Sequence, residues 1–163
     1  MSITQSRLQD LLSYDPETGL FTWLVQRGPA RAGDVAGCVS SGGYCRIRLD
    51  GRLYEGHRLV WLYLFNRAPA HEIDHVNGLR HDNRLVNLRE ATDSQNQGNR
   101  ALGRDNKSGF KGVFWRESTE RWYAKITYQG KQKHLGSFTD SASAKAAYDQ
   151  AAGELFGEFA RPA

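Results

Sequence analysis

A carboxylate and an imidazole stand side by side in the middle of this chain. Asp74 directly precedes His75, and the amide side chains of Asn87 and Asn96 follow twelve and twenty-one residues after the histidine. Oxygen donors of this kind suit a hard divalent cation that keeps several waters, Mg²⁺ above all, rather than zinc. An imidazole beside such a metal can take a proton from an attacking water, because its ordinary pKa lies near about 6.5. These are the two requirements of phosphodiester hydrolysis: charge compensation and a deprotonated water.

The hydrophobic pattern predicts the elements that must position these side chains. We expect HRLVWLYLFNRA (57–68) to form a helix and EIDHVNG (72–78) to form a short strand that enters a turn. RLVNLREAT (84–92) is expected to be extended, and DSQNQGNR (93–100) to be a helix capped by Asp93. A strand end, a loop and a helix would then converge on one ion.

Upstream of this stretch, the pattern predicts a β-rich segment. A short helical pattern around Leu8 ends in a turn at 15–19, and short strands follow at 19–25, 44–50 and 52–57.

The C-terminal third predicts a small separate domain. Beyond a polar stretch at 101–109, interpreted as a linker, we expect a three-stranded meander and an Ala-rich helix at 141–157. Residues 108–137 carry six basic and two acidic side chains, and this charge predicts that one face meets a polyanion. Alternation along the strands predicts an inner face of Val113, Trp115, Trp122, Ala124 and Ile126, and an outer face of Phe114, Arg116, Tyr123, Lys125 and Thr127.

The composition is typical of a folded protein, with 39% hydrophobic and 25% charged residues among 163, which allows one or two small domains. The net charge of +4 is compatible with a polyanionic partner but does not require one. Cys38 and Cys45 are too few for a disulfide framework or a four-cysteine zinc site. The longest apolar run, LVWLYLF (59–65), is far shorter than the about 20 residues of a membrane span. The N-terminus lacks a signal-peptide pattern, so we expect a soluble, cytoplasmic chain.

Four short motifs follow one another at suitable spacings: DHVNG (74–78), DNR (82–84), NLR (87–89) and SQN (94–96). Together with GHRLVW (56–61), they resemble the ββα-metal core of HNH nucleases. The resemblance is to the phage and intron homing-endonuclease branch, in which Asn replaces the last His of the name. It covers roughly residues 40–100.

The resemblance implies a role for each of the four residues. Asp74 and Asn96 would be the metal ligands, His75 the general base, and Asn87 would orient His75 by hydrogen bonding and hold the loop. An amide oxygen is harder than an imidazole nitrogen, which further favours Mg²⁺ or Mn²⁺ over zinc or copper. His57, at the start of the apolar helix, is expected to be a structural hydrogen bonder rather than a ligand.

A second resemblance lies in the C-terminal third, at GV (112–113), WYAKI (122–126), LGSF (135–138) and AAYDQAA (146–152). These motifs resemble the ethylene-response-factor (Apetala-type) DNA-binding domain over about residues 107–161. In that family the three-stranded sheet lies in the major groove. The sheet positions that this implies for DNA contact are Lys111, Phe114, Arg116, Lys125, Thr127, Gln132 and His134. Several of these positions are Arg or Trp in the plant proteins, which leaves the recognised sequence open.

The expected fold class is α+β. A β-rich segment (1–56) leads into an HNH catalytic core (57–100), and together they form a nuclease domain at 1–100. A linker at 101–109 follows, and then a domain at 110–163 with a three-stranded antiparallel sheet packed on one helix. The expected activity is metal-dependent hydrolysis of DNA phosphodiester bonds by a monomer, with double-stranded DNA as the partner and no membrane. Further DNA contacts are expected from Arg46, Arg48 and Arg52.

Three alternatives stay open. The chain could be a non-catalytic DNA-binding protein, similar to a transcription factor, whose nuclease-like part is a scaffold. The C-terminal sheet could bind protein instead of DNA. RNA is a weaker alternative substrate, because the major groove of A-form helices is too narrow for the sheet.

Overall fold

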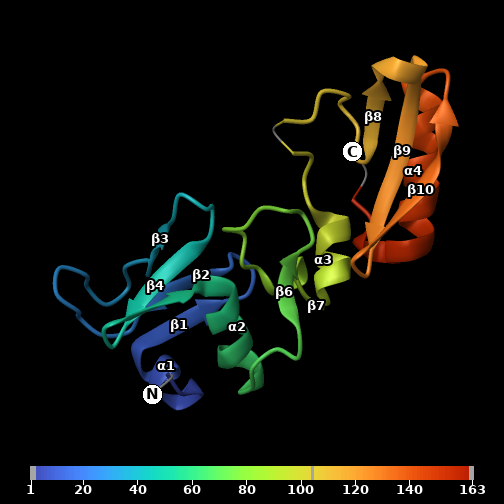
Figure 1. Cartoon of the computed structure of the whole chain (residues 1–163). Helices are drawn as coiled ribbons and strands as arrows, with labels where there is room; N and C mark the ends of the chain where they lie inside the picture. The colour runs from blue at the N-terminus through green and yellow to red at the C-terminus, as the bar shows by residue number, and fades with distance from the viewer. Residues whose placement is uncertain (1–2, 104, 162–163) are drawn as a thin grey trace. The chain divides into compact units, whose positions relative to one another are not determined.

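The computed structural model describes residues 3–103 and 105–161, and its elements are shown in Figure 1. The chain divides into two compact units, residues 1–90 and 91–163, referred to below as the N-terminal and C-terminal units. The boundary falls inside the predicted catalytic core (57–100), so the helix expected at 93–100 groups with the C-terminal unit. The mixed α+β fold class is confirmed.

The N-terminal unit combines helices with short strands. Its elements are α1 (Gln5–Leu11), β1 (Leu12–Asp15), β2 (Leu20–Trp23), β3 (Cys38–Val39), β4 (Cys45–Leu49), β5 (Arg52–Glu55), α2 (Gly56–Phe65), β6 (Glu72–His75), the 3₁₀ turn η1 (Leu85–Asn87) and β7 (Leu88–Ala91). β1 pairs antiparallel with β2, β4 lies between its antiparallel neighbours β3 and β5, and β6 pairs with β7.

The core of this unit forms where the two helices meet the strands. Alternation along β4 buries Ile47 and Leu49, while Leu59 and Val60 contribute from α2 and Leu8 from α1. Each of these side chains is almost completely removed from water, and each buried aliphatic side chain contributes roughly 1.5–3 kcal/mol. This core fixes α2 and the strands that precede it, and so provides a firm base for the loop between β6 and β7.

The C-terminal unit contains a sheet whose strand order is β10-β9-β8, with antiparallel pairing throughout. Its elements are α3 (Asp93–Asn99), β8 (Val113–Arg116), η2 (Glu117–Thr119), β9 (Arg121–Tyr128), β10 (Lys131–Phe138), α4 (Ser141–Phe156) and η3 (Gly157–Phe159). Small residues of α4 pack against the sheet: Ala144 shares a core with Val113 and Ala124, and Ala151 shares one with Ile126. Asp140 caps α4 by accepting from the Ser143 N–H at 2.8 Å.

Three details differ from the sequence-based expectations. The cap of α3 is Thr92, not Asp93, and it forms a capping box with Gln95, so that each side chain bonds the backbone of the other residue. Trp115, expected on the inner face, is 42% exposed and packs edge-on against Trp122 at 5.4 Å. Strands β1 and β3 were not predicted: β1 directly follows α1 and was included in the helical pattern before the turn at 15–19, and β3 has only two residues.

No helix in the part of the chain that the structure describes combines the length and apolar character needed to cross a membrane.

Candidate active site

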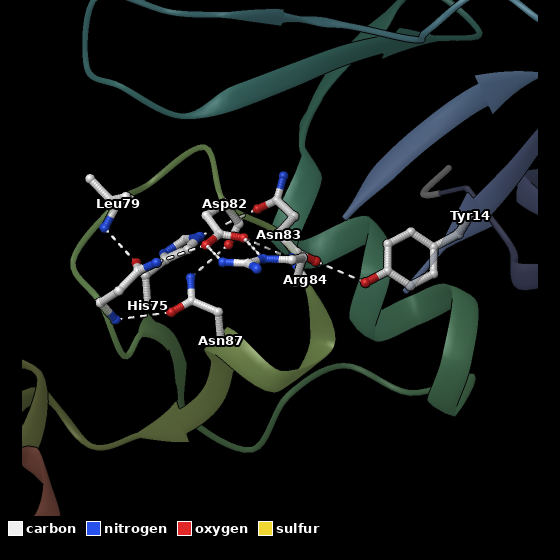
Figure 2. A network of polar contacts seen from close by, with 8 residues as sticks. Tyr14, His75, Leu79, Asp82, Asn83, Arg84 and Asn87 are labelled. Atoms are coloured by element: carbon white, nitrogen blue, oxygen red, sulfur yellow. Dashed lines mark hydrogen bonds and ion pairs between the residues drawn. The ribbon is translucent and has the colours of Figure 1, made fainter. Parts of the chain in front are cut away.

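The segment between β6 and β7 is a loop held in shape by its own polar side chains (Figure 2). The Asn87 side chain accepts a hydrogen bond from the Asn77 N–H at 2.9 Å and donates one to the Asp82 carbonyl at 2.8 Å. Asn77 donates to the Asp82 carboxylate at 2.7 Å, and Arg84 donates to both of its oxygens, at 2.8 and 2.6 Å. The bonds from Arg84 hold the pKa of Asp82 well below its usual range. This network fixes the course of the loop.

His75 lies at the end of β6, where the chain enters this loop, and is only 4% exposed. Its ring packs edge-on against that of His57, with the ring centres 5.2 Å apart, and against Tyr44 at 6.1 Å. Burial lowers the pKa of His75 below its ordinary value. The imidazole is therefore neutral at neutral pH, which is the form that can accept a proton.

The His75 ring is held by Asn83, whose Oδ1 lies 3.3 Å from His75 Nε2. A neutral imidazole that donates from Nε2 to this oxygen keeps its basic lone pair on Nδ1. Asn83 is itself buried, and its carbonyl accepts a hydrogen bond from the Tyr14 hydroxyl at 2.8 Å. A Cβ at Gly56 would lie 2.6 Å from Asn83 Nδ2, so the glycine at the start of α2 makes room for this side chain.

Asp74 points into the protein from the neighbouring position of β6 and is 5% exposed. Arg89, on β7, donates to its Oδ2 from Nε and lies within ion-pair distance of the same oxygen through Nη2, each at 3.0 Å. A buried carboxylate needs such a partner, because desolvation otherwise disfavours its charge. Asp74 is therefore fixed in position beside His75, and as an oxygen donor it fits a hard divalent cation.

The hydrogen bond to His75 that the sequence assigned to Asn87 comes from Asn83. Asn87 instead bonds the Asn77 N–H and the Asp82 carbonyl, which matches the loop-holding part of its predicted role. In the sequence, Asn83 stands inside the DNR motif (82–84), which was used as a family signature without a chemical role for its asparagine. A buried asparagine eight residues after a candidate base gives no periodic signal, so spacing could not find it.

His57 is a second buried histidine of the N-terminal unit, 5% exposed at the start of α2. Burial, together with the nearby His75, lowers its pKa to about 3, so it is neutral. Its Nε2 lies 3.5 Å from Glu55 Oε2, whereas its Nδ1 has no hydrogen-bond partner among the described residues. The His57 ring therefore packs against the His75 ring, and its role as a structural hydrogen bonder stays a prediction.

Asn96 lies on α3, in the C-terminal unit, whereas Asp74 belongs to the N-terminal unit. The two predicted metal ligands therefore belong to different units, and each is described here within its own unit. Within the C-terminal unit, α3 packs on α4, and Gly98 allows a close approach, because a Cβ there would lie 2.7 Å from the Phe156 ring. The donors themselves, a carboxylate and an amide oxygen, fit Mg²⁺ or Mn²⁺.

Apart from Lys111, the predicted DNA-contacting positions of the C-terminal sheet lie on its outer face. Strand register pairs Phe114 with Tyr123, Lys125 with His134, and Thr127 with Gln132. The Phe114 and Tyr123 rings stack at 5.8 Å, and the His134 ring lies 5.5 Å from that of Tyr123. Two cations lie over these rings, Arg116 at 4.4 Å from the Tyr123 centre and Lys125 at 5.0 Å from the Phe114 centre.

Lys111, also predicted to contact DNA, is engaged elsewhere in the C-terminal unit. Its Nζ donates to the Gly98 carbonyl at 3.1 Å and to the Arg161 carbonyl at 2.8 Å. Both acceptors lie close to the end of a helical segment, where carbonyl groups need donors. Lys111 therefore ties α3 to the C-terminal segment and does not lie on the outer face.

The three N-terminal arginines do not share one face either. Arg46 and Arg48 alternate with buried residues of β4, whereas Arg52 is paired in register with Leu49 and so falls on the opposite face of the sheet. Arg46 lies 3.5 Å from Glu55, and Arg48 donates to the Gly51 carbonyl at 3.3 Å.

Comparison of the sequence with known proteins gives two matches, one to a family model and one to a phage protein. Residues 54–97 match the family model described as HNH endonuclease. The chain is also 34% identical over 106 residues to protein 3.8 of Escherichia phage T7, a match that covers 64% of this chain and 87% of the phage protein. The chain belongs to the family of this phage protein. It carries an HNH-type nuclease domain, and DNA is the substrate that such a domain implies. No solved structure matches the chain.

The matched segment runs from β5 to α3 and contains Asp74, His75, Asn83, Asn87 and Asn96. It therefore spans the whole loop network and the helix that follows it. The C-terminal sheet lies outside the matched residues, so its role is argued from its own surface.

Proposed function

We propose that this protein is a metal-dependent DNA endonuclease of the HNH homing type, encoded by a phage and acting as a monomer in the host cytoplasm. The observation that carries the proposal is the buried His75, held through Nε2 by Asn83 and placed beside Asp74. A neutral, fixed imidazole next to a carboxylate is the arrangement that general-base hydrolysis requires. The catalytic domain of this proposal comprises residues 1–100, with its core at 57–100.

In this mechanism each side chain has one task. Asp74 and Asn96 would hold Mg²⁺ or Mn²⁺, which when bound supplies charge compensation at the scissile phosphate. His75 takes the proton of the attacking water, and Asn83 holds the imidazole ring through Nε2. Asn87 holds the loop that carries the base.

Binding to duplex DNA is assigned to the outer face of the C-terminal sheet, residues 110–163, beyond the linker at 101–109. This face resembles that of ethylene-response-factor domains in its position on a three-stranded sheet. Arg116 and Lys125 supply positive charge, and the stacked Phe114 and Tyr123 rings supply flat apolar surface. Cations bind phosphates, and apolar side chains contact base edges such as the thymine methyl group. Arg46, Arg48 and Arg52 add contacts from the N-terminal unit.

A plasmid assay tests this function. The full chain is incubated with supercoiled plasmid and Mg²⁺, Mn²⁺ or EDTA, and the products are mapped on both strands. We expect cleavage with either cation and none in EDTA. Asp74→Ala, and Asp74→Asn as the variant of similar shape, should keep duplex affinity and lose cleavage, whereas Asp10→Ala, which removes an exposed carboxylate, should cut normally.

The alternative function has its own outcome in this assay. Tight duplex binding without cleavage under any cation would establish the non-catalytic DNA-binding protein instead. Equal cleavage by wild type and both Asp74 variants would remove Asp74 from the mechanism.

A further inference from the structure

A cavity of about 280 Å³ lies within the C-terminal unit, on the side where the sheet edge meets the end of α3. The end of α3, the segment after it, β9, β10 and α4 all contribute to its walls. It falls just below the about 300–1,000 Å³ of typical small-molecule sites, so it can hold one compact ligand. Nothing in the HNH motif accounts for it, since its walls lie mostly outside the residues of that motif.

The lining is positively charged. Arg100 and Lys111 are the lining residues that supply this charge, because the ammonium of Lys125, a third lining residue, lies over the Phe114 ring; none of the lining residues in the described chain carries a carboxylate. Lys111 donates two hydrogen bonds, to the Gly98 and Arg161 carbonyls. An ammonium group has three N–H donors, so one remains for a further acceptor. This charge favours an anionic ligand.

The other walls are aromatic and amide in character. Tyr148 and Phe156 of α4 line the cavity together with Gln97 of α3 and Gln132 of β10. A glutamine amide both donates and accepts hydrogen bonds, as does the edge of a nucleobase, and glutamine can bond adenine through two atoms. Aromatic side chains stack on any base, with about 1–3 kcal/mol per base in single-strand binding. Charge, amide and ring together fit a nucleotide.

The position of the cavity indicates where this nucleotide comes from. Lys125, Thr127 and Gln132 belong both to the cavity lining and to the predicted DNA-contacting positions of the sheet. Gln97 directly follows Asn96 on α3, the helix that carries a predicted metal ligand. A DNA strand lying along the sheet face therefore reaches the cavity mouth without leaving the surface assigned to DNA.

We propose that this cavity binds one unpaired nucleotide of the DNA strand, with its phosphate near Arg100 and Lys111 and its base against Tyr148. This inference rests on the proposed function, because it assumes that the sheet face binds DNA. A nucleotide extruded from duplex must lose its stacking and pairing, which costs a few kcal/mol, and less when it is already unpaired. A DNA site with a bulged nucleotide should therefore bind more tightly than a fully paired one.

The test compares two duplexes of the same sequence, one fully paired and one with a single bulged nucleotide, in Ca²⁺ or EDTA to prevent cleavage. Wild-type protein should bind the bulged duplex about tenfold more tightly, which lies within the range expected for stacking one base. Gln97→Ala and Arg100→Ala should remove most of this preference while leaving the affinity for paired duplex within about twofold. Gln150→Ala, an exposed glutamine of α4, is the matched control and should keep the preference.

Each outcome separates the two proposals. Equal affinity of wild type for both duplexes would overturn the cavity proposal and leave DNA binding intact, whereas failure to bind either duplex would overturn the proposed function itself. Retention of the bulge preference in both cavity variants, with unfolding curves like wild type, would also overturn the proposal. The affinity for free deoxynucleoside monophosphates is measured as well. If they bind as tightly as the bulged duplex, the claim that the bound nucleotide belongs to a DNA strand is wrong.

Discussion

The cations next to the candidate active site and those on the outer face of the sheet have different partners. In the N-terminal unit, the guanidinium groups of Arg84 and Arg89 bond carboxylates, at 2.6 Å to Asp82 and 3.0 Å to Asp74. In the C-terminal unit, Arg116 and Lys125 lie over aromatic rings of an open sheet face. A guanidinium paired with a carboxylate orients that carboxylate, and the two charges compensate each other. A cation over an aromatic ring has no such compensating charge.

This difference separates two tasks. Partly buried ion pairs stabilise little by themselves, because desolvation offsets the attraction, but they hold a carboxylate in one geometry. Unpaired surface cations contribute little to stability, yet they can neutralise phosphates and release counterions. The N-terminal unit is therefore suited to positioning a catalytic group, and the sheet to holding a polyanion.

The largest expected effect comes from the positioned base. His75→Ala should lower the single-turnover cleavage rate by on the order of 10²-fold or more, the usual scale for removing a general base. Duplex affinity should stay unchanged, since the sheet is intact. His71→Ala, an exposed histidine just before β6, is the control and should cut normally. A His75→Ala protein that cuts at the wild-type rate would break the assignment of catalysis to this unit.

Loss of the side chain that holds His75 should have the next largest effect. Asn83→Ala should lower the cleavage rate by about 10–100-fold, the scale seen when partners that orient a functional histidine are removed, with no change in the dissociation constant for DNA. Asn87→Ala should act mainly on stability, at about 1–3 kcal/mol, because it leaves two loop groups unpaired. Rate measurements and urea unfolding on both variants separate these roles. If the two variants show the same loss of rate and of stability, Asn83 and Asn87 do not have the separate roles assigned to them.

The sheet cations should show their effect in the salt dependence of binding. Replacing Arg116 and Lys125 together by Ala should reduce the slope of log K against log salt by about 2, one for each lost phosphate contact. The control is the double Ala variant of Arg7 and Arg27, which also removes two positive charges. Both of these arginines pair with Asp50 in the N-terminal unit. This control variant should leave the slope nearly unchanged. Equal slopes for the two double variants would mean that net charge, not the sheet face, determines binding.

A smaller effect is expected in acid, which should lower the stability of the N-terminal unit through His57. Because the pKa of His57 is about 3 in the folded chain and about 6.5 when unfolded, its contribution to stability is complete above pH 6.5 and is lost as pH falls toward 3. The loss approaches about 1.4 kcal/mol for each pH unit in that window. Glu55, Tyr44 and His75 face this ring, and the charge of Arg58 acts on it.

Urea unfolding at pH 5.5 and 7, followed by amide NMR in each unit, measures this difference. His57→Gln should flatten the pH dependence of the N-terminal unit, whereas the exposed His134→Gln should leave it unchanged. A pH dependence that survives in His57→Gln would assign it to other groups.

The sequence was sufficient for features set by local pattern. The α+β class, the strand of Asp74 and His75, and the outer face around Phe114 and Lys125 all follow from alternation, turns and motif order, each of which depends on residues close together in the chain. The HNH motif was found for the same reason, since its members occur in one continuous stretch.

The sequence alone was insufficient wherever distant residues had to meet. Lys111 looked like a sheet residue, yet its ammonium group bonds carbonyls thirteen and fifty positions away. Arg52 looked like a partner of Arg46 and Arg48, but strand register places it on the other face.

The sequence by itself determined which chemical groups this protein has for hydrolysis, because residue types and short spacings are written directly in it. Tertiary structure decided which side chains hydrogen-bond to one another in the candidate site. It gave His75 to Asn83 rather than to Asn87, made room for that contact at Gly56, and gave Asp74 to Arg89. Such pairings depend on how α2 packs against the loop and how β6 meets β7, and contacts between residues far apart in the sequence leave no periodic pattern in it.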